Sequence, residues 1–295
     1  MISVVIPSYN RRDCILRLLK DVYSQKDAEF EVIVVDDCST DDSVDAIQQA
    51  FPQVHLLVNE ENGGPCVTRN RGVMAAKGEI IVGLDSDVSI EDPRLLARVE
   101  QTLSSHPKVT GLAFRILKPD GVSEDVERWW HPVPVETHAG KSFLTDYFSG
   151  TGYAFRKEAM IKAGLYPEYL YMHYEEVELA FRMLDNGGGI LHCPDLKVLH
   201  HEGKADGRSK VQLYYKPRNQ ILLALSCYPL GHAICYLIPR VGFQFLRATA
   251  NRHLGSYFRA MIDGFSKGKE RLSLRKPLKP ETLVHLRELK RGISP

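Results

Sequence analysis

Short apolar runs alternate with amphipathic segments through the first hundred residues, and this alternation constrains the fold more than any other feature. The apolar runs predict buried strands at residues 2–6, 30–35, 54–58 and 80–84. Helical spacing of apolar residues recurs between them, at Ile15, Leu18, Leu19 and Val22, at Val44 and Ile47, and over residues 67–77. Strands that alternate with helices form right-handed crossovers, so the sequence predicts an α/β fold with a central, mostly parallel sheet and helices on both faces.

Polar side chains follow three of these predicted strands. Asn10 follows the first strand, Asp36 and Asp37 the second, and Asp85 and Asp87 the fourth. In open α/β sheets the ligand crevice lies at the carboxyl ends of the strands. We therefore expect these side chains to converge on one edge of the sheet and to form the site.

Asp85 and Asp87 stand two residues apart, directly after a buried strand. Carboxylate oxygens are hard ligands that suit Mg²⁺ or Mn²⁺. Such a cation neutralises the charge that develops on a departing diphosphate. A D-x-D triplet taken alone is more often a capped turn. The interpretation as a metal site therefore depends on its position at the end of a strand.

The regular alternation loosens after residue 92. Residues 118–141, which include Trp129 and Trp130, read as a loop, and the two tryptophans are equally compatible with sugar stacking and with core packing. Helices are predicted at 155–163 and 174–186, and residues 211–266 are rich in helical patterns. The sequence thus predicts a catalytic domain over 1–210 and a helical, basic region over 211–295.

Seven short motifs occur in an order and spacing that together are specific. They are V-V-I-P-S-Y-N (4–10), V-V-D-D-C-S-T-D (34–41), N-G-G-P-C-V-T-R-N-R-G (62–72), L-D-S-D (84–87), S-G-T-G-Y-A-F-R (149–156), E-E-V-E-L-A-F-R (175–182) and V-L-H-H (198–201). The chain resembles family 2 glycosyltransferases over residues 1 to about 225. Y-Y-K-P-R-N (214–219) is similar to a segment of rhamnosyltransferase-like bacterial members. The resemblance implies the GT-A fold and an inverting sugar transfer.

The resemblance also implies roles for individual residues. It places the nucleotide of the donor against Pro7, Tyr9, Asp37, Arg69 and Asp85. It places a metal cofactor, Mn²⁺ or Mg²⁺, against Asp85, Asp87 and His200. Asp87 would be the direct metal ligand, and His201 is the alternative to His200. For Asp37 a helix cap is the competing interpretation.

An inverting transfer needs a carboxylate that takes the proton of the acceptor hydroxyl. By the resemblance this catalytic base is Glu176, although the family usually has Asp at positions 176 and 178, where this chain has Glu. Glu175 therefore stays a live alternative, and a solvated acidic helix face is the competing interpretation. We expect partial burial beside Glu175 and Glu178 to raise the pKa of the base.

The C-terminal region differs in charge from the rest of the chain. Residues 210–295 hold 16 Lys and Arg against 4 Asp and Glu, whereas residues 1–209 hold 22 against 33. An uncharged run at 219–239 is long enough to span a bilayer, but Pro229 and Pro239 interrupt it. We expect this region to lie at a membrane interface through apolar residues at 221–225, 236–238 and 243–246 and through Phe258, Met261, Ile262 and Phe265. Packing on the body or in a homodimer is the alternative.

These features lead to one expected function and two alternatives. The expected enzyme moves a sugar from a nucleotide-diphosphate donor to a saccharide or lipid-linked saccharide in surface polysaccharide synthesis. The alternatives are a polyprenyl-phosphate sugar synthase and a catalytically silent nucleotide-sugar binding module.

The six cysteines form no paired motif, which predicts a cytoplasmic protein. Together with the C-terminal region, this predicts a peripheral location at the inner face of the membrane. A net charge of +1 gives no indication of a nucleic acid partner.

Overall fold

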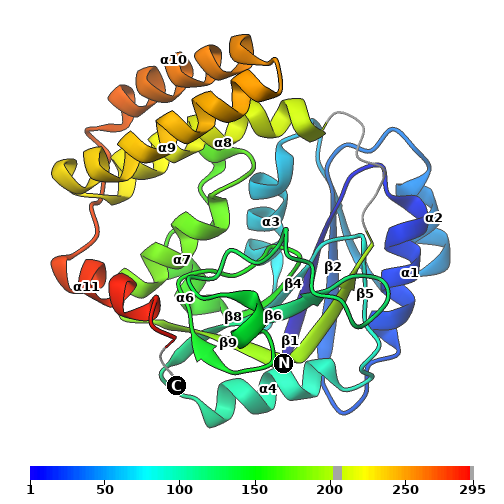
Figure 1. Cartoon of the computed structure of the whole chain (residues 1–295). Coiled ribbons are helices and arrows are strands. Elements are labelled where there is room, and N and C mark those ends of the chain that lie inside the picture. Colours follow the sequence, from blue (N-terminus) through cyan, green and yellow to red (C-terminus); the bar gives the residue numbers. More distant parts are fainter. Residues whose placement is uncertain (202–207, 293–295) are drawn as a thin grey trace.

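The computed structural model describes residues 1–201 and 208–292 of the chain (Figure 1). Over these residues a single mixed sheet contains the strands β1 (Ile2–Ser8), β2 (Phe30–Asp36), β3 (His55–Val58), β4 (Ile80–Leu84), β5 (Val88–Ser89), β6 (Val109–Leu117), β7 (Phe143–Leu144), β8 (Gly152–Arg156) and β9 (Gly189–His200). The strand order is β3-β2-β1-β4-β8-β6-β9-β5, and β7 pairs with β9. The predicted α/β class is confirmed.

The N-terminal half of the sheet is parallel and the other half is mixed. β1 pairs in parallel with β2 and β4, and β2 pairs in parallel with β3. β8 runs antiparallel between β4 and β6, and β9 is parallel to β6. The four predicted strands are thus confirmed, and their carboxyl ends lie on one edge.

The helix predicted at 155–163 is wrong in its first residues. Residues 152–156 form β8, and α6 (Lys157–Lys162) begins only after it. Ala154 and Phe155 are buried between β4 and β6. A strand buried on both faces has no alternating polar pattern, so its apolar run resembles a stretch of helix.

Two layers of helices cover the two faces of the sheet (Figure 1). One face packs against α1 (Arg12–Tyr23), α2 (Ser43–Ala50) and α4 (Leu95–Ser105), and the other against α3 (Gly64–Ala75), α6 and α7 (Glu175–Asp185). Val4 and Ile6 of β1 belong to the first core and Val5 to the second, as the twofold period of a strand requires. The prediction of helices on both faces is confirmed.

The C-terminal region consists of α8 (Arg208–Cys227), α9 (Leu230–Ala250), α10 (Leu254–Arg271) and α11 (Pro280–Leu289). Helix α8 contacts α7 on one side and α9 and α10 on the other (Figure 1). Leu223 and Cys227 share a core with Phe181 and Leu184 of α7 and with leucines of α11. This apolar contact attaches the region to the sheet domain, and the division at residue 210 stays a prediction.

The apolar residues of the C-terminal helices divide into buried and exposed groups. The stretch 221–224 is fully buried between α7, α9 and α10, so the expected membrane contact of 221–225 is wrong for these residues. A second group is exposed and comprises Ile234, Ile238, Phe243, Leu246, Phe258, Ile262 and Phe265. Within the described residues, no helix combines the length and the apolar character needed to cross a bilayer.

Candidate active site

Two adjoining cavities lie at the carboxyl edge of the sheet. The edge cavity, of about 470 Å³, is lined by the ends of β1, β2 and β4 and by the N-terminal turn of α3. The loop cavity, of about 590 Å³, is lined by residues of the 126–130 loop, by the Ser149–Thr151 turn and by the start of α7. The cavities share four residues, namely Pro65, Arg69, Asp85 and Met172.

The structure brings the sequence-predicted site residues to these two cavities. The edge cavity is lined by Pro7, Tyr9, Asp37, Arg69, Asp85 and Asp87. Glu175 and Glu176 line the loop cavity. His200 lines neither cavity, because it is buried behind Asp87 at the end of β9. The expected convergence is therefore confirmed for Asp37, Asp85 and Asp87. It is wrong for Asn10 and Asp36, which line neither cavity because their side-chain oxygens accept hydrogen bonds from the amides of Thr40 and Ser39.

Asp37 organises the loop that closes one side of the edge cavity. Its Oδ1 accepts hydrogen bonds from Asn59 Nδ2 at 2.7 Å and from the amide of Gly63 at 3.0 Å, and its Oδ2 accepts one from the amide of Gly64 at 2.8 Å. Gly64 has φ +80°, and a Cβ there would lie 2.4 Å from the Tyr171 ring. Asp37 thus caps the start of α3, whereas the helix that follows it in sequence is α2. The same side chain also lines the edge cavity.

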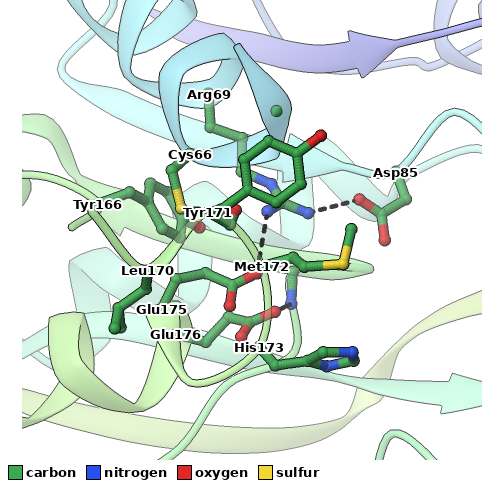
Figure 2. Close-up of polar contacts among 12 residues, drawn as sticks. Cys66, Arg69, Asp85, Tyr166, Leu170, Tyr171, Met172, His173, Glu175 and Glu176 are labelled. Carbon is green, nitrogen blue, oxygen red and sulfur yellow. Dashed lines mark hydrogen bonds and ion pairs between the residues drawn. The ribbon is translucent and has the colours of Figure 1, made fainter. Parts of the chain in front are cut away.

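Arg69 links the two cavities (Figure 2). This buried side chain of α3 places Nη2 2.7 Å from Asp85 Oδ1 and Nη1 3.8 Å from Glu175 Oε1. Burial acts to raise the pKa of Asp85, but the charges of Arg69 and Arg128 hold it below its usual value. Burial, and then the charge of Glu176, raise the pKa of Glu175 well above its usual value. The bridge therefore joins one carboxyl group whose pKa is lowered to another whose pKa is raised.

Glu176 directs its carboxylate toward the turn at Gly150. Its Oε1 accepts a hydrogen bond from the Gly150 amide at 3.3 Å. A Cβ at Gly150 would lie 2.6 Å from Arg69 Nη2 and 2.9 Å from Glu176 Oε1, so a side chain at this position would displace the ends of both site residues. Glu178 instead contacts the Tyr169 hydroxyl and lies 3.6 Å from Arg182, outside both cavities. The expectation that Glu178 adjoins the base is wrong, because it lies on another face of α7.

Asp87, His200 and Asp125 form a chain behind the edge cavity. His200 Nδ1 lies 2.7 Å from Asp125 Oδ2, and its Nε2 lies 3.8 Å from Asp87 Oδ1. Burial and the charge of Asp85 raise the pKa of Asp87. Although burial opposes it, the hydrogen bond with His200 lowers the pKa of Asp125. A carboxylate that holds one imidazole nitrogen so that the other faces a ligand position is typical of metal sites.

The described residues contain no group of three or more His, Cys, Asp or Glu arranged to hold a metal ion. Asp85, one of the predicted ligands, is engaged by Arg69. Asp87 and His200 offer one oxygen and one nitrogen, and Mg²⁺ commonly binds through one or two protein groups together with substrate phosphates. The donor set thus fits a cation that arrives with a diphosphate.

The segment that leads into α7 adopts a rare backbone conformation. Tyr171, His173 and Tyr174 have φ values of 65°, 66° and 72°, where residues other than glycine are uncommon. Asn219 of α8 holds this segment, because its Nδ2 donates to the carbonyl oxygens of Leu170, Met172 and His173 at 2.9, 2.7 and 2.8 Å. Sequence reasoning missed this role, and its only signal was the Y-Y-K-P-R-N motif that ends at Asn219.

The far wall of the loop cavity is aromatic and basic. It includes Trp129, Trp130, Arg128, Lys216 and Arg247. Lys216 Nζ lies 5.4 Å from the centre of the Trp130 ring. The three cations were not predicted as site residues, because two of them come from helices whose position follows only from tertiary packing. Only Arg128 had a signal in the sequence, because it directly precedes the two tryptophans.

A family model described as glycosyl transferase family 2 matches residues 3–164 of the chain. This chain belongs to glycosyl transferase family 2. Among curated relatives, TuaG of Bacillus subtilis (strain 168), named for teichuronic acid biosynthesis, is 33% identical over 42% of this chain and 51% of its own length. The succinoglycan biosynthesis protein ExoO of Rhizobium meliloti (strain 1021) is 33% identical over 41% of this chain and 35% of its own length. The matches thus span about half or less of these relatives.

Two solved structures resemble this family 2 glycosyltransferase at 21% identity. TarS 1-349 of S. aureus in complex with UDP-GlcNAc has a TM-score of 0.64 and covers 92% of this chain and 82% of its own. The mannosyltransferase PcManGT from Pyrobaculum calidifontis, in complex with GDP-Man and Mn²⁺, has a TM-score of 0.60 and covers 98% of this chain and 84% of its own. The fold is that of the GT-A glycosyltransferases, as the sequence predicted.

Proposed function

We propose that this family 2 glycosyltransferase moves a sugar, with inversion, from a nucleotide-diphosphate donor to a hydroxyl of a saccharide or lipid-linked saccharide in surface polysaccharide assembly. One observation carries the proposal. The two cavities meet at the bridge from Asp85 through Arg69 to Glu175, and Glu176 stands on the far side of that bridge. A donor in the edge cavity and an acceptor in the loop cavity would therefore meet beside a carboxylate.

The edge cavity suits the nucleotide. Its wall combines the exposed ring of Tyr9 with Pro7 and with the loop that Asp37 holds. Asp87 and His200 would hold Mn²⁺ or Mg²⁺ against the diphosphate, where the cation would stabilise the negative charge of the leaving group. Relatives of the same fold are described with GDP-Man and Mn²⁺ and with UDP-GlcNAc, which supports a donor of this class.

The two glutamates take different roles in this proposal. Glu175 is buried and its Oε1 lies 3.8 Å from Arg69 Nη1, so its carboxyl group is engaged with that side chain. Glu176 is the better base, and the Gly150 amide orients it toward the loop cavity. It would take the proton of the acceptor hydroxyl as the oxygen attacks the anomeric carbon opposite the diphosphate. Glu175 would position Arg69 between the two cavities.

This arrangement also distinguishes the proposal from its alternatives. An ionised lipid phosphate carries no proton that must be removed before it attacks, so a positioned base favours a hydroxyl acceptor over a polyprenyl phosphate. A catalytically silent binding module would not need a carboxylate such as Glu176 beside the loop cavity. The presence of both cavities with their carboxylates therefore supports an enzyme.

The exposed apolar residues of α9 and α10 support a peripheral membrane location. Ile262 is 69% exposed and Phe258 53% exposed, one helical turn apart on α10. Exposed Lys267 and Lys269 follow on the same helix. Apolar side chains beside lysines suit an anionic membrane surface. The enzyme would then work at the inner face of the membrane, where a lipid-linked acceptor is available.

A donor screen tests the proposed function. Nucleotide-diphosphate sugars with different bases and sugars are added with Mn²⁺, and the thermal midpoint of the protein is measured, since a ligand that binds only the folded state raises it. Nucleotide release is then followed for wild type, Asp87→Ala and Glu176→Gln with the donor that binds. We expect release by the wild type and much slower release by both variants. Equal and negligible release by all three proteins with every donor would contradict the enzyme proposal.

A further inference from the structure

Basic side chains of the C-terminal helices enter the loop cavity. Lys216 of α8 and Arg247 of α9 line it, together with Arg128 from the 118–141 loop. Lys216 and Arg247 lie outside residues 3–164, which the family model matches. The C-terminal region therefore completes the wall of a cavity whose opposite wall carries Glu176.

These three cations differ in whether a carboxylate lies close enough to neutralise their charge. Arg128 Nε lies 4.0 Å from Asp125 Oδ2. For Lys216 and Arg247, no carboxylate oxygen of the described residues lies within 4.0 Å. Burial, and then the positive charge of Arg247, lower the pKa of Lys216, although the charge of Glu127, which also lines the cavity, acts in the opposite direction. Two partly buried like charges that face one cavity indicate a site for a negatively charged group.

The donor does not account for this positive wall. Under the proposed function, the donor diphosphate lies beside Asp87 in the edge cavity, which Arg11 and Arg69 also line. Lys216 and Arg247 line only the loop cavity. They face whatever occupies the space between Trp130 and Glu176, and in the proposed function that molecule is the acceptor.

We propose that the acceptor carries an anionic group, a phosphate or a carboxylate, and that Lys216 and Arg247 bind it. The proposal rests on the proposed function and deepens it by naming the class of acceptor. Trp130, with Lys216 above its ring, would contact the sugar next to the anion. The acceptor hydroxyl would then extend toward Glu176. A lipid-linked diphosphate and an acidic sugar share this chemistry.

Tryptophan fluorescence gives a direct test, because the only two tryptophans of the chain, Trp129 and Trp130, both line the loop cavity. The protein is titrated in EDTA, without donor, with inorganic pyrophosphate, with methyl β-D-glucuronide and with methyl β-D-glucoside as the neutral match. We expect at least one of the two anions to change the emission at concentrations where the glucoside has no effect. Lys216→Gln/Arg247→Gln should weaken that binding by about tenfold or more, since a hydrogen bond to a charged group is lost at each position.

Lys269→Gln, which removes an exposed lysine of α10, is the matched control and should bind like the wild type. The single variants Lys216→Gln and Arg247→Gln are measured too, and circular dichroism verifies that each variant is folded. Tighter binding of pyrophosphate assigns the anion to a diphosphate, and tighter binding of the glucuronide assigns it to an acidic sugar. The proposal is overturned if neither anion binds, if the glucoside binds as well as the tighter of the two anions, or if the folded double variant keeps wild-type affinity for that anion. Nucleotide release plays no role in this test, so its failure is separate from a failure of the proposed function.

Discussion

Asn219 Nδ2 lies 2.8 Å from the carbonyl oxygen of His173, two residues before the glutamate pair. A side chain of the C-terminal region thus fixes the backbone that places Glu175 and Glu176. The same amide also binds Leu170 and Met172, and Met172 lines both cavities. The strained segment is maintained from α8, outside the sheet domain.

We predict that Asn219→Ala releases this segment. The two N–H groups of this amide serve three carbonyl oxygens, and at about 1 kcal/mol for each N–H the free energy of unfolding should fall by about 2 kcal/mol. At a temperature where the variant is fully folded, kcat should still fall at least tenfold, because Glu176 loses its fixed position. Asn251→Ala, which removes an exposed amide at the end of α9, serves as control. Wild-type kcat in folded Asn219→Ala would refute a positioning role.

The two glutamates should separate kinetically. Removal of a general base typically costs about 10²–10⁴ in rate, so Glu176→Gln should lose that much in kcat. Glu175→Gln keeps a neutral group beside Arg69 and should lose far less. A larger loss in Glu175→Gln than in Glu176→Gln would reverse the assignment.

Asp125 should act on the metal through His200. Loss of a carboxylate that orients a metal-binding histidine typically costs 10–100-fold in metal affinity, so Asp125→Asn should need about that much more Mn²⁺ for half-maximal transfer. Asp120→Asn removes an exposed carboxylate from the same loop and should leave the Mn²⁺ requirement unchanged. An unchanged Mn²⁺ requirement in Asp125→Asn, or transfer without any divalent cation, would exclude His200 from metal binding.

Stability should depend on pH through Asp146. Burial raises its pKa to about 6 in the folded protein, above the value of about 3.9 for an unfolded chain. The folded state then binds more protons between these values, so this contribution to stability falls as the pH rises from about 4 to 6 and stays low above 6. Asp146→Asn should therefore raise the free energy of unfolding by about 2 kcal/mol at pH 7.5 and change it little at pH 3.8. Urea unfolding at both pH values measures this, with exposed Asp195→Asn as control. A destabilised Asp146→Asn at pH 7.5 would contradict the predicted sign.

The exposed apolar face of α9 and α10 should bind anionic bilayers. Phe258→Ser/Ile262→Ser removes two side chains worth about 1.5–3 kcal/mol each when buried, so it should weaken binding to phosphatidylglycerol vesicles at least tenfold. Val284→Ser, which changes an exposed residue of α11, should bind like the wild type. If the wild type does not bind vesicles but forms a dimer that the double variant cannot form, this face is a subunit interface instead.

Most of the sheet domain was predictable because its signals are local. The buried strands are continuous apolar runs, and their carboxyl ends hold Tyr9, Asp37 and Asp85, so the edge cavity followed from the parallel topology. β8 was read as the beginning of a helix because a strand buried between two neighbours has no polar alternation.

The loop cavity was less predictable because it depends on distant packing. Lys216 reaches the cavity, and Asn219 holds its lining residues Met172 and His173, only because α8 packs against α7 and the segment before it. A helical pattern in α8 does not reveal which face meets the sheet domain. The position of Glu178 could not be inferred either, since three acids in one turn differ only in the direction that packing gives them.

Time-resolved ¹H NMR of the first products tests the central claim most directly. The donor is an α-linked nucleotide-diphosphate sugar identified by the screen, and the coupling constant of the anomeric proton reports the configuration of the transferred sugar. We predict that the wild type gives a β-linked product in the presence of Mn²⁺ and that Glu176→Gln forms it at least about 100-fold more slowly. An α-linked product, or undiminished transfer by Glu176→Gln, would contradict an inverting transfer based on Glu176.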